Sequence, residues 1–255
     1  MTKIDIVSGF LGAGKTTLIK CVLPDKLERI ESGAFSSTSL TGTVQLPEGL
    51  KYVAGFGSTK ITNVQFPSTL EEIGDSAFEG CKSLMCEILL PESLKKIGKS
   101  AFSYSHISGN LVLPEGLEDI GNSAFSNCYY LTGSLSIPQG IKVIKSGTFS
   151  GSGLDGNLIL PKGLVEIGGA AFSNSGLRGE LNIPSTVTII GGSAFSGAKF
   201  SGTLVLPENL ITLGSGAFYN CQWLTGIVEF PQNIVSIPSS IFSGCRNIEG
   251  VVLHK

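Results

Sequence analysis

The sequence predicts a repeat solenoid of about ten coils, each 23–24 residues long, with a parallel strand-lined face. Three observations predict it: prolines at nearly constant spacing, aliphatic residues at fixed positions around each proline, and a phenylalanine at a fixed position downstream. A single unit of this kind cannot bury its own apolar side. Stacked units place equivalent residues over one another and so form one continuous core.

Ten prolines mark the units, and they are separated by 23, 20, 24, 23, 24, 23, 23, 23 and 24 residues. The second unit is the short one, so we expect a thinner coil or a local kink there. The prolines that define the units are Pro24, Pro47, Pro67, Pro91, Pro114, Pro138, Pro161, Pro184, Pro207 and Pro231.

Aliphatic residues occur three positions and one position before the prolines, which is the period of two that a short strand requires. A glycine recurs five positions before the proline, where a corner needs a backbone conformation that a side chain would hinder. The aliphatic residues three before are Val44, Ile88, Leu111, Leu135, Leu158, Leu181 and Leu204, and those one before are Leu46, Leu90, Leu113, Ile137, Leu160, Ile183 and Leu206.

Downstream of the proline, aliphatic residues recur three and six positions later, and a phenylalanine follows at position eleven. Phe56, nine after Pro47, is the exception. Acidic pairs such as Glu71-Glu72 and Glu118-Asp119 fall four and five after the proline, where we expect solvated surface. The phenylalanines at position eleven are Phe35, Phe78, Phe102, Phe125, Phe149, Phe172, Phe195, Phe218 and Phe242.

Residues between the two aliphatic positions of each strand point away from the core, because side chains alternate along a strand. Four of them, Leu89, Val112, Ile159 and Val205, are aliphatic, and an apolar ladder exposed on a sheet can mark a partner-binding face. The alternative is that β-branched residues simply suit strands. The ten outward positions are Gln45, Gln65, Leu89, Val112, Ser136, Ile159, Asn182, Val205, Glu229 and Val252.

The repeat resembles a known family. Units such as LPEGLEDIGNSAFSNC (Leu113 to Cys128) and IPSTVTIIGGSAFSGA (Ile183 to Ala198) resemble the BspA-like leucine-rich repeats of bacterial and protist surface proteins. The resemblance covers residues 23–255. It implies a right-handed leucine-rich-repeat solenoid, a role in adhesion or protein binding, and a cell-surface or secreted location. A parallel β-helix of similar coil length is the structural alternative.

Residues 1–22 form a separate segment. Gly9 to Thr16 match G-x-x-x-x-G-K-[ST], in which Gly9, Gly14, Lys15 and Thr16 would hold the phosphates and magnesium of a nucleotide. MTKIDIVSGFLGAGKTTLIK resembles the start of the CobW-type metallochaperone GTPases, but the resemblance stops at about Lys20. We therefore expect a non-functional fragment or an improvised cap. The alternative is a GTP- or ATP-binding protein whose repeats form a recognition arm.

The rest of the sequence indicates a non-enzymatic scaffold for a protein or glycan partner. We predict no catalytic residues, no metal and no cofactor, because no residue is placed by motif to pair with either histidine. The net charge of -2 and the lack of a basic run exclude nucleic acid as a partner class. No stretch is apolar enough to insert in a membrane, and no signal peptide is visible.

Cysteines recur three positions after the repeat phenylalanine, at Cys81, Cys128, Cys221 and Cys245. Other units have serine, threonine or alanine there, so we expect small filler side chains. Cys221 and Cys245 fall in adjacent coils, where a disulfide is possible in an oxidising compartment. Residues 251–255 resemble the first strand of another coil, so we expect a longer native array.

Overall fold

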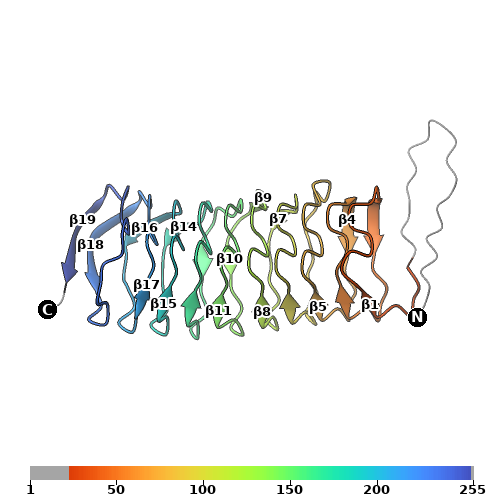
Figure 1. Ribbon diagram of the computed structural model, residues 1–255, viewed down its shortest axis with the longest axis horizontal. Helices are drawn as coiled ribbons and strands as arrows, with labels where there is room; N and C mark the ends of the chain where they lie inside the picture. The colour runs from red at the N-terminus through yellow and green to blue at the C-terminus, as the bar shows by residue number, and fades with distance from the viewer. Residues whose placement is uncertain (1–22, 254–255) are drawn as a thin grey trace.

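The computed structural model describes residues 23–253, which form a rod of stacked coils (Figure 1). The first and last described coils lie at opposite ends of the rod. All regular elements in this range are strands, with no helix among them, and every strand pair is parallel. The predicted parallel-strand solenoid is confirmed.

One row of strands lies at or before the prolines and provides the predicted strand-lined face. Equivalent residues pair across coils, as Leu135 does with Leu158 and Ser136 with Ile159. The strands of this row are β2 (Thr41–Gln45), β4 (Lys60–Gln65), β7 (Ser108–Asn110), β9 (Tyr130–Thr132), β10 (Leu135–Ser136), β12 (Leu158–Ile159), β14 (Arg178–Glu180), β16 (Lys199–Thr203), β18 (Leu224–Phe230) and β19 (Ile248–Leu253).

A second row of two-residue strands lies after the prolines, where the sequence analysis expected aliphatic positions and surface acids. It forms one sheet of order β1-β3-β5-β6-β8 and another of order β11-β13-β15-β17. The strands of the second row are β1 (Arg29–Ile30), β3 (Tyr52–Val53), β5 (Glu72–Ile73), β6 (Lys96–Ile97), β8 (Asp119–Ile120), β11 (Val143–Ile144), β13 (Glu166–Ile167), β15 (Ile189–Ile190) and β17 (Thr212–Leu213).

The repeat phenylalanines stack face to face through the core of the rod. Neighbouring ring centroids lie 5.0–5.8 Å apart from Phe35 to Phe242, and most ring planes are nearly parallel. Phe56 belongs to this ladder although its unit is short, with centroids 5.0 Å from Phe35 and 5.6 Å from Phe78. The shorter unit therefore keeps its ring in the core. The continuous core predicted from the spacing is observed.

The recurrent glycine five positions before the proline was expected at a corner, but Gly42, Gly109 and Gly202 lie inside β2, β7 and β16. At Gly42, Gly109 and Gly202 the backbone φ is 83°, 81° and 83°, in the left-handed region that side chains disfavour. Gly156 does not share this conformation, but a Cβ there would lie 2.5 Å from the backbone nitrogen of Ser134. Close packing between coils, rather than φ, explains that glycine.

Candidate functional site

The predicted partner-binding residues lie together on one face of the rod. Leu89, Val112, Ile159 and Val205 are 79%, 62%, 57% and 70% exposed. Their sequence neighbours are turned inward, as Val112 shows between the buried Leu111 and Leu113. Of the four, only Ile159 lies within a strand, β12; the other three lie in extended segments without strand pairing. The alternation inferred from the sequence is therefore present in three dimensions.

The aliphatic ladder is discontinuous. Leu89 and Val112 are on neighbouring coils, whereas the exposed Ser136 and Asn182 separate Val112, Ile159 and Val205 from one another. Ser136 pairs directly with Ile159 in the register of β10 and β12. The face is thus a mixed surface in which aliphatic patches alternate with polar side chains.

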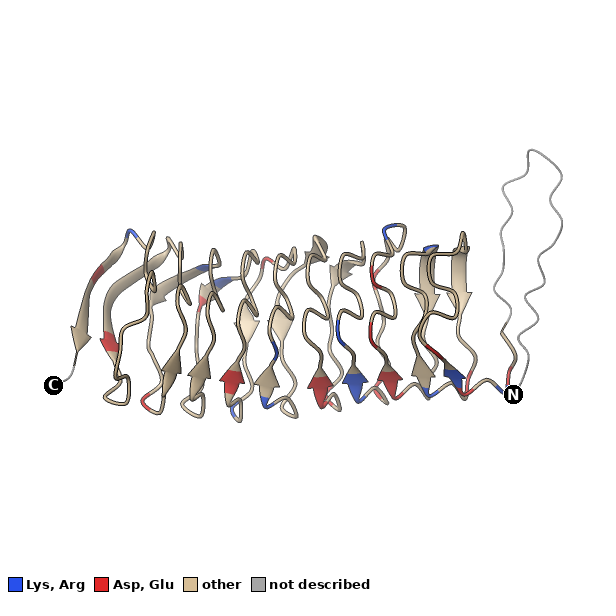
Figure 2. Ribbon diagram, viewed as in Figure 1, with Lys and Arg blue, Asp and Glu red and all other residues tan. Residues whose placement is uncertain are grey.

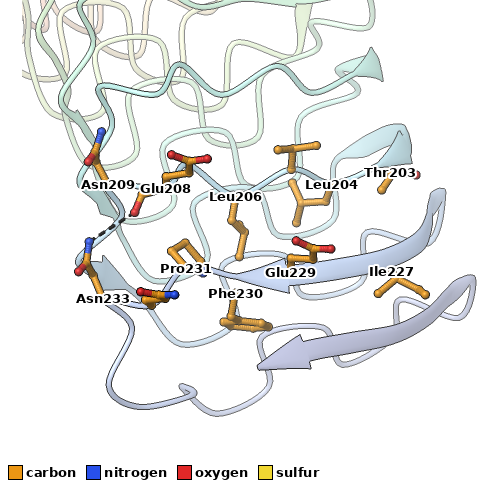
Figure 3. A pocket seen from close by; sticks show the side chains of 12 residues that line it. Thr203, Leu204, Leu206, Glu208, Asn209, Ile227, Glu229, Phe230, Pro231 and Asn233 are labelled. Carbon is orange, nitrogen blue, oxygen red and sulfur yellow. Dashed lines mark hydrogen bonds between the residues drawn. The ribbon is translucent and has the colours of Figure 1, made fainter. Parts of the chain in front are cut away.

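A groove of about 660 Å³ indents this face near its carboxyl-terminal end (Figure 3). It lies between the coils of β16 and β18. Val205 and Ile227 supply exposed aliphatic side chains, and Glu208 and Glu229 supply carboxylates. The lining residues are Thr203, Leu204, Val205, Leu206, Glu208, Asn209, Ile227, Glu229, Phe230, Pro231, Gln232 and Asn233.

Of the groove residues, the sequence analysis placed Val205 and Glu229 on the outward face and selected Val205 for partner contact. Ile227 lies four positions before its proline, where the preceding described coils have residues such as Asn110, Asn157 and Thr203. An exposed aliphatic residue in a polar position is the signal that could have drawn attention to this coil. The hollow itself depends on the separation of two coils, which the spacing of prolines does not specify.

Charges on the second row of strands are compensated from coil to coil. Lys51 binds Glu71 of the next coil, and Lys96 Nζ lies 2.8 Å from Glu72 Oε1. Lys145 Nζ lies 2.6 Å from Asp119 Oδ1. Hydrogen bonding to the glutamates raises the pKa of Lys51 and of Lys96. In Figure 2, basic residues (blue) and acidic residues (red) accordingly lie close together along this row. The acidic pairs are surface residues, as predicted.

Charges on the strand-lined face are not compensated. We define this face as the residues from four before to one after each proline from Pro47 to Pro231. Within these bounds its only cation is Lys162, because Lys60, Arg178 and Lys199 lie at the first residues of β4, β14 and β16, just outside them. No ion pair within residues 23–253 involves any of its acids. The acids of the face are Glu48, Glu87, Glu92, Glu115, Glu180, Glu208 and Glu229, all exposed.

The recurring cysteines occupy the small position next to the phenylalanine ladder. The thiols of Cys81, Cys128 and Cys221 each donate to the carbonyl of the phenylalanine one coil earlier, at 3.1 Å. Ser175 fills the same position and donates to Phe172 O at 2.8 Å. These thiols therefore fill a small position in the turn and hydrogen-bond to its backbone, as expected from the sequence.

Burial controls the chemistry of these thiols. It raises the pKa of Cys128 to about 12. The hydrogen bond to Cys245, together with burial, raises the pKa of Cys221. Both cysteines of this adjacent pair are free thiols here. Between residues 23 and 253 no three histidine, cysteine or acidic side chains are grouped closely enough to hold a metal ion.

The nucleotide-binding motif, Gly9, Gly14, Lys15 and Thr16, lies outside the described residues. In the range that the structure describes, no helix has the length and apolar character needed to span a bilayer. The described site is therefore the face of the solenoid.

The stacked parallel coils and the exposed strand-lined face together define this protein as a solenoid repeat scaffold. The BspA type leucine rich repeat region matches residues 13–132, 54–178 and 131–249, and the chain belongs to this family. The resemblance of residues 1–20 to CobW-type GTPases finds no support in the comparisons. A comparison with curated proteins gives no match.

Solved structures with the same fold come from several bacteria. A leucine-rich repeat protein of Bacteroides ovatus is 23% identical, with a TM-score of 0.63, over 89% of this chain and 64% of its own. A leucine rich cell surface protein of Faecalibacterium prausnitzii is 20% identical, with a TM-score of 0.53, over 91% and 78%. YopM of Yersinia enterocolitica is 17% identical, with a TM-score of 0.56, over 91% and 52%. The chain thus spans less than two thirds of the B. ovatus protein.

Proposed function

We propose that this chain is a non-enzymatic binding or adhesion scaffold whose strand-lined face, centred on Leu89, Val112, Ile159 and Val205, contacts a protein or glycan. The observation that carries the proposal is the exposure of these four aliphatic side chains between buried or partly buried neighbours on one face. Leaving such side chains in water costs free energy that a partner would recover.

Strand propensity alone does not account for the pattern. Leu89 is the most exposed of the four, at 79%, and leucine is not a β-branched residue. Val205 also borders the groove, so its side chain belongs to a concave surface. Concave or extended faces are the surfaces that solenoid proteins commonly use for partners.

Family membership supports a scaffold rather than a catalyst and supports a location at the cell surface or outside the cell. The leucine-rich repeat family is generally non-enzymatic. The F. prausnitzii relative in fold is a leucine rich cell surface protein. Neither observation identifies the partner, so the proposal is confined to the class of partner and to the face that meets it.

The proposal is tested by selecting binders from a displayed library of random peptides and from an array of immobilised oligosaccharides. The Val112→Lys, Ile159→Lys double variant should lose binders that the original chain retains, because a lysine ammonium replaces an apolar contact in each patch. Val165→Lys is the matched control, since Val165 is also exposed but lies beside the second row. Circular dichroism establishes that each variant is folded. Equal binding by the original chain and the double variant would remove this face from consideration.

No observation in the described residues favours nucleotide binding as a second function. The motif at Gly9 to Thr16 rests on the sequence alone, and we do not propose an activity for it.

A further inference from the structure

The distribution of charge differs between the two strand rows of the rod. On the second row, lysines and acids from successive coils neutralise one another through ion pairs such as Lys96 with Glu72. Within the bounds of the strand-lined face, seven exposed glutamates accompany one lysine and form no ion pair in the described range, even with Lys60, Arg178 and Lys199 at the starts of β4, β14 and β16. One chain therefore carries a compensated surface and an acidic, uncompensated one.

The groove joins this acidic character to apolar surface. Val205 and Ile227 are 70% and 52% exposed on its wall, and Glu208 and Glu229 come from the same two coils. Figure 3 shows Glu208, Ile227 and Glu229 around the opening. The amides of Asn209 and Asn233 donate to backbone carbonyls of the preceding coil, at 3.1 and 3.4 Å. Among the described residues no cation lines the groove, and neither Glu208 nor Glu229 forms an ion pair there.

Exposed aliphatic side chains beside carboxylates are complementary to a long cationic side chain. Lysine and arginine have apolar stems that pack on aliphatic surface and cationic heads that bind carboxylates. An acidic ligand would be repelled by Glu208 and Glu229. A neutral sugar would gain nothing from the charges, and the ring of Phe230 is buried rather than available for stacking.

We infer that the groove between the coils of β16 and β18 binds a basic, extended segment of a partner protein, with lysine or arginine stems on Val205 and Ile227 and their heads at Glu208 and Glu229. This inference rests on the proposed function and narrows the partner to a peptide with cationic side chains. Binding should be sensitive to salt, because the carboxylates and the cationic heads attract one another at an open surface.

The test uses the whole chain and a short peptide of alternating valine and lysine, labelled for fluorescence anisotropy. Matched peptides of valine with glutamate and of valine with glutamine are the comparison. The lysine peptide should bind, binding should weaken as sodium chloride is raised, and the other two peptides should bind much more weakly. The Glu208→Gln, Glu229→Gln double variant should weaken binding about tenfold, because two charge pairs at an open surface are lost.

Glu118→Gln is the matched control, because it removes a glutamate charge from the second row. Equal binding of the three peptides, or equal losses in the control and the groove variant, would overturn the inference. The inference would also be overturned if the chain formed a dimer that dissociates in the groove variant, because a second copy of the chain would then occupy the groove. Failure here is distinct from failure of the proposed function. If peptides bind through Val112 and Ile159 while the lysine peptide does not bind the groove better than its comparison peptides, only the inference is refuted.

Discussion

Replacement of Phe172 by alanine tests whether the phenylalanine ladder holds the coils together. The ring is fully buried and lies 5.6 Å from Phe149 and 5.5 Å from Phe195. Truncating a buried phenylalanine to alanine costs about 3–5 kcal/mol, and each lost ring stack adds to the upper part of that range. We therefore expect the free energy of unfolding to fall by about 5 kcal/mol.

The measurement is urea unfolding followed by circular dichroism, with hydrogen exchange to locate the loss. In a stacked array each unit contacts only its neighbours, so protection should fall first in the coils of Phe149, Phe172 and Phe195. Phe242→Ala, at a half-buried ring, should cost about half as much. Val205→Ala, on the exposed face, should change stability by less than about 0.5 kcal/mol. If the Phe172 variant lost no more than the Val205 variant, the ladder would not be a source of stability.

Two further predictions concern the small position beside the ladder. Ser152 Oγ is the buried side-chain oxygen without a hydrogen-bond partner in the described range. Ser152→Ala should therefore raise the free energy of unfolding, measured in urea, by about 1 kcal/mol. An unchanged or lower value would contradict the idea that this hydroxyl is left without a partner. Burial raises the pKa of Cys128 from 9.0 to about 12, so the unfolded chain loses this proton at lower pH than the native chain does. The free energy of unfolding should therefore fall as the pH rises from 9 towards 12, and the fall should be smaller in Cys128→Ser. Parallel pH profiles for the two proteins would exclude this thiol as the cause.

The coil and its core could be predicted because their causes recur at a fixed spacing. A proline, two alternating aliphatic residues and a phenylalanine determine which side chains face inward, and Phe172 and Val112 both lie where the pattern places them. Phe56 departs from the spacing, and the sequence analysis assigned it to the phenylalanine position of a shortened unit. Its stacking with Phe35 and Phe78 confirms that assignment.

The candidate site was predicted less completely, because it depends on relations between coils rather than within them. Alternation along one strand identifies Val205 as outward, but the groove beside it needs the next coil and the separation between them. The same holds for charge. Glu72 and Glu229 are both strand acids that reach the surface. Only the parallel register shows that Glu72 pairs with Lys96, whereas Glu229 pairs with Val252.

The parallel register also explains why charged residues are arranged differently on the two rows of strands. In a parallel stack, each outward side chain lies beside the equivalent side chain of the next coil, so an unbroken row of like charge repels itself. The second row avoids this repulsion by alternating sign, as Glu72, Lys96 and Asp119 do on successive coils. On the strand-lined face most neighbouring glutamates instead differ in position, as Glu180, Glu208 and Glu229 do on three successive coils, whereas Glu92 and Glu115 share a position on adjacent coils. That arrangement limits repulsion within the rod while leaving the acids unpaired, and unpaired acids beside exposed aliphatic side chains are available to a basic partner.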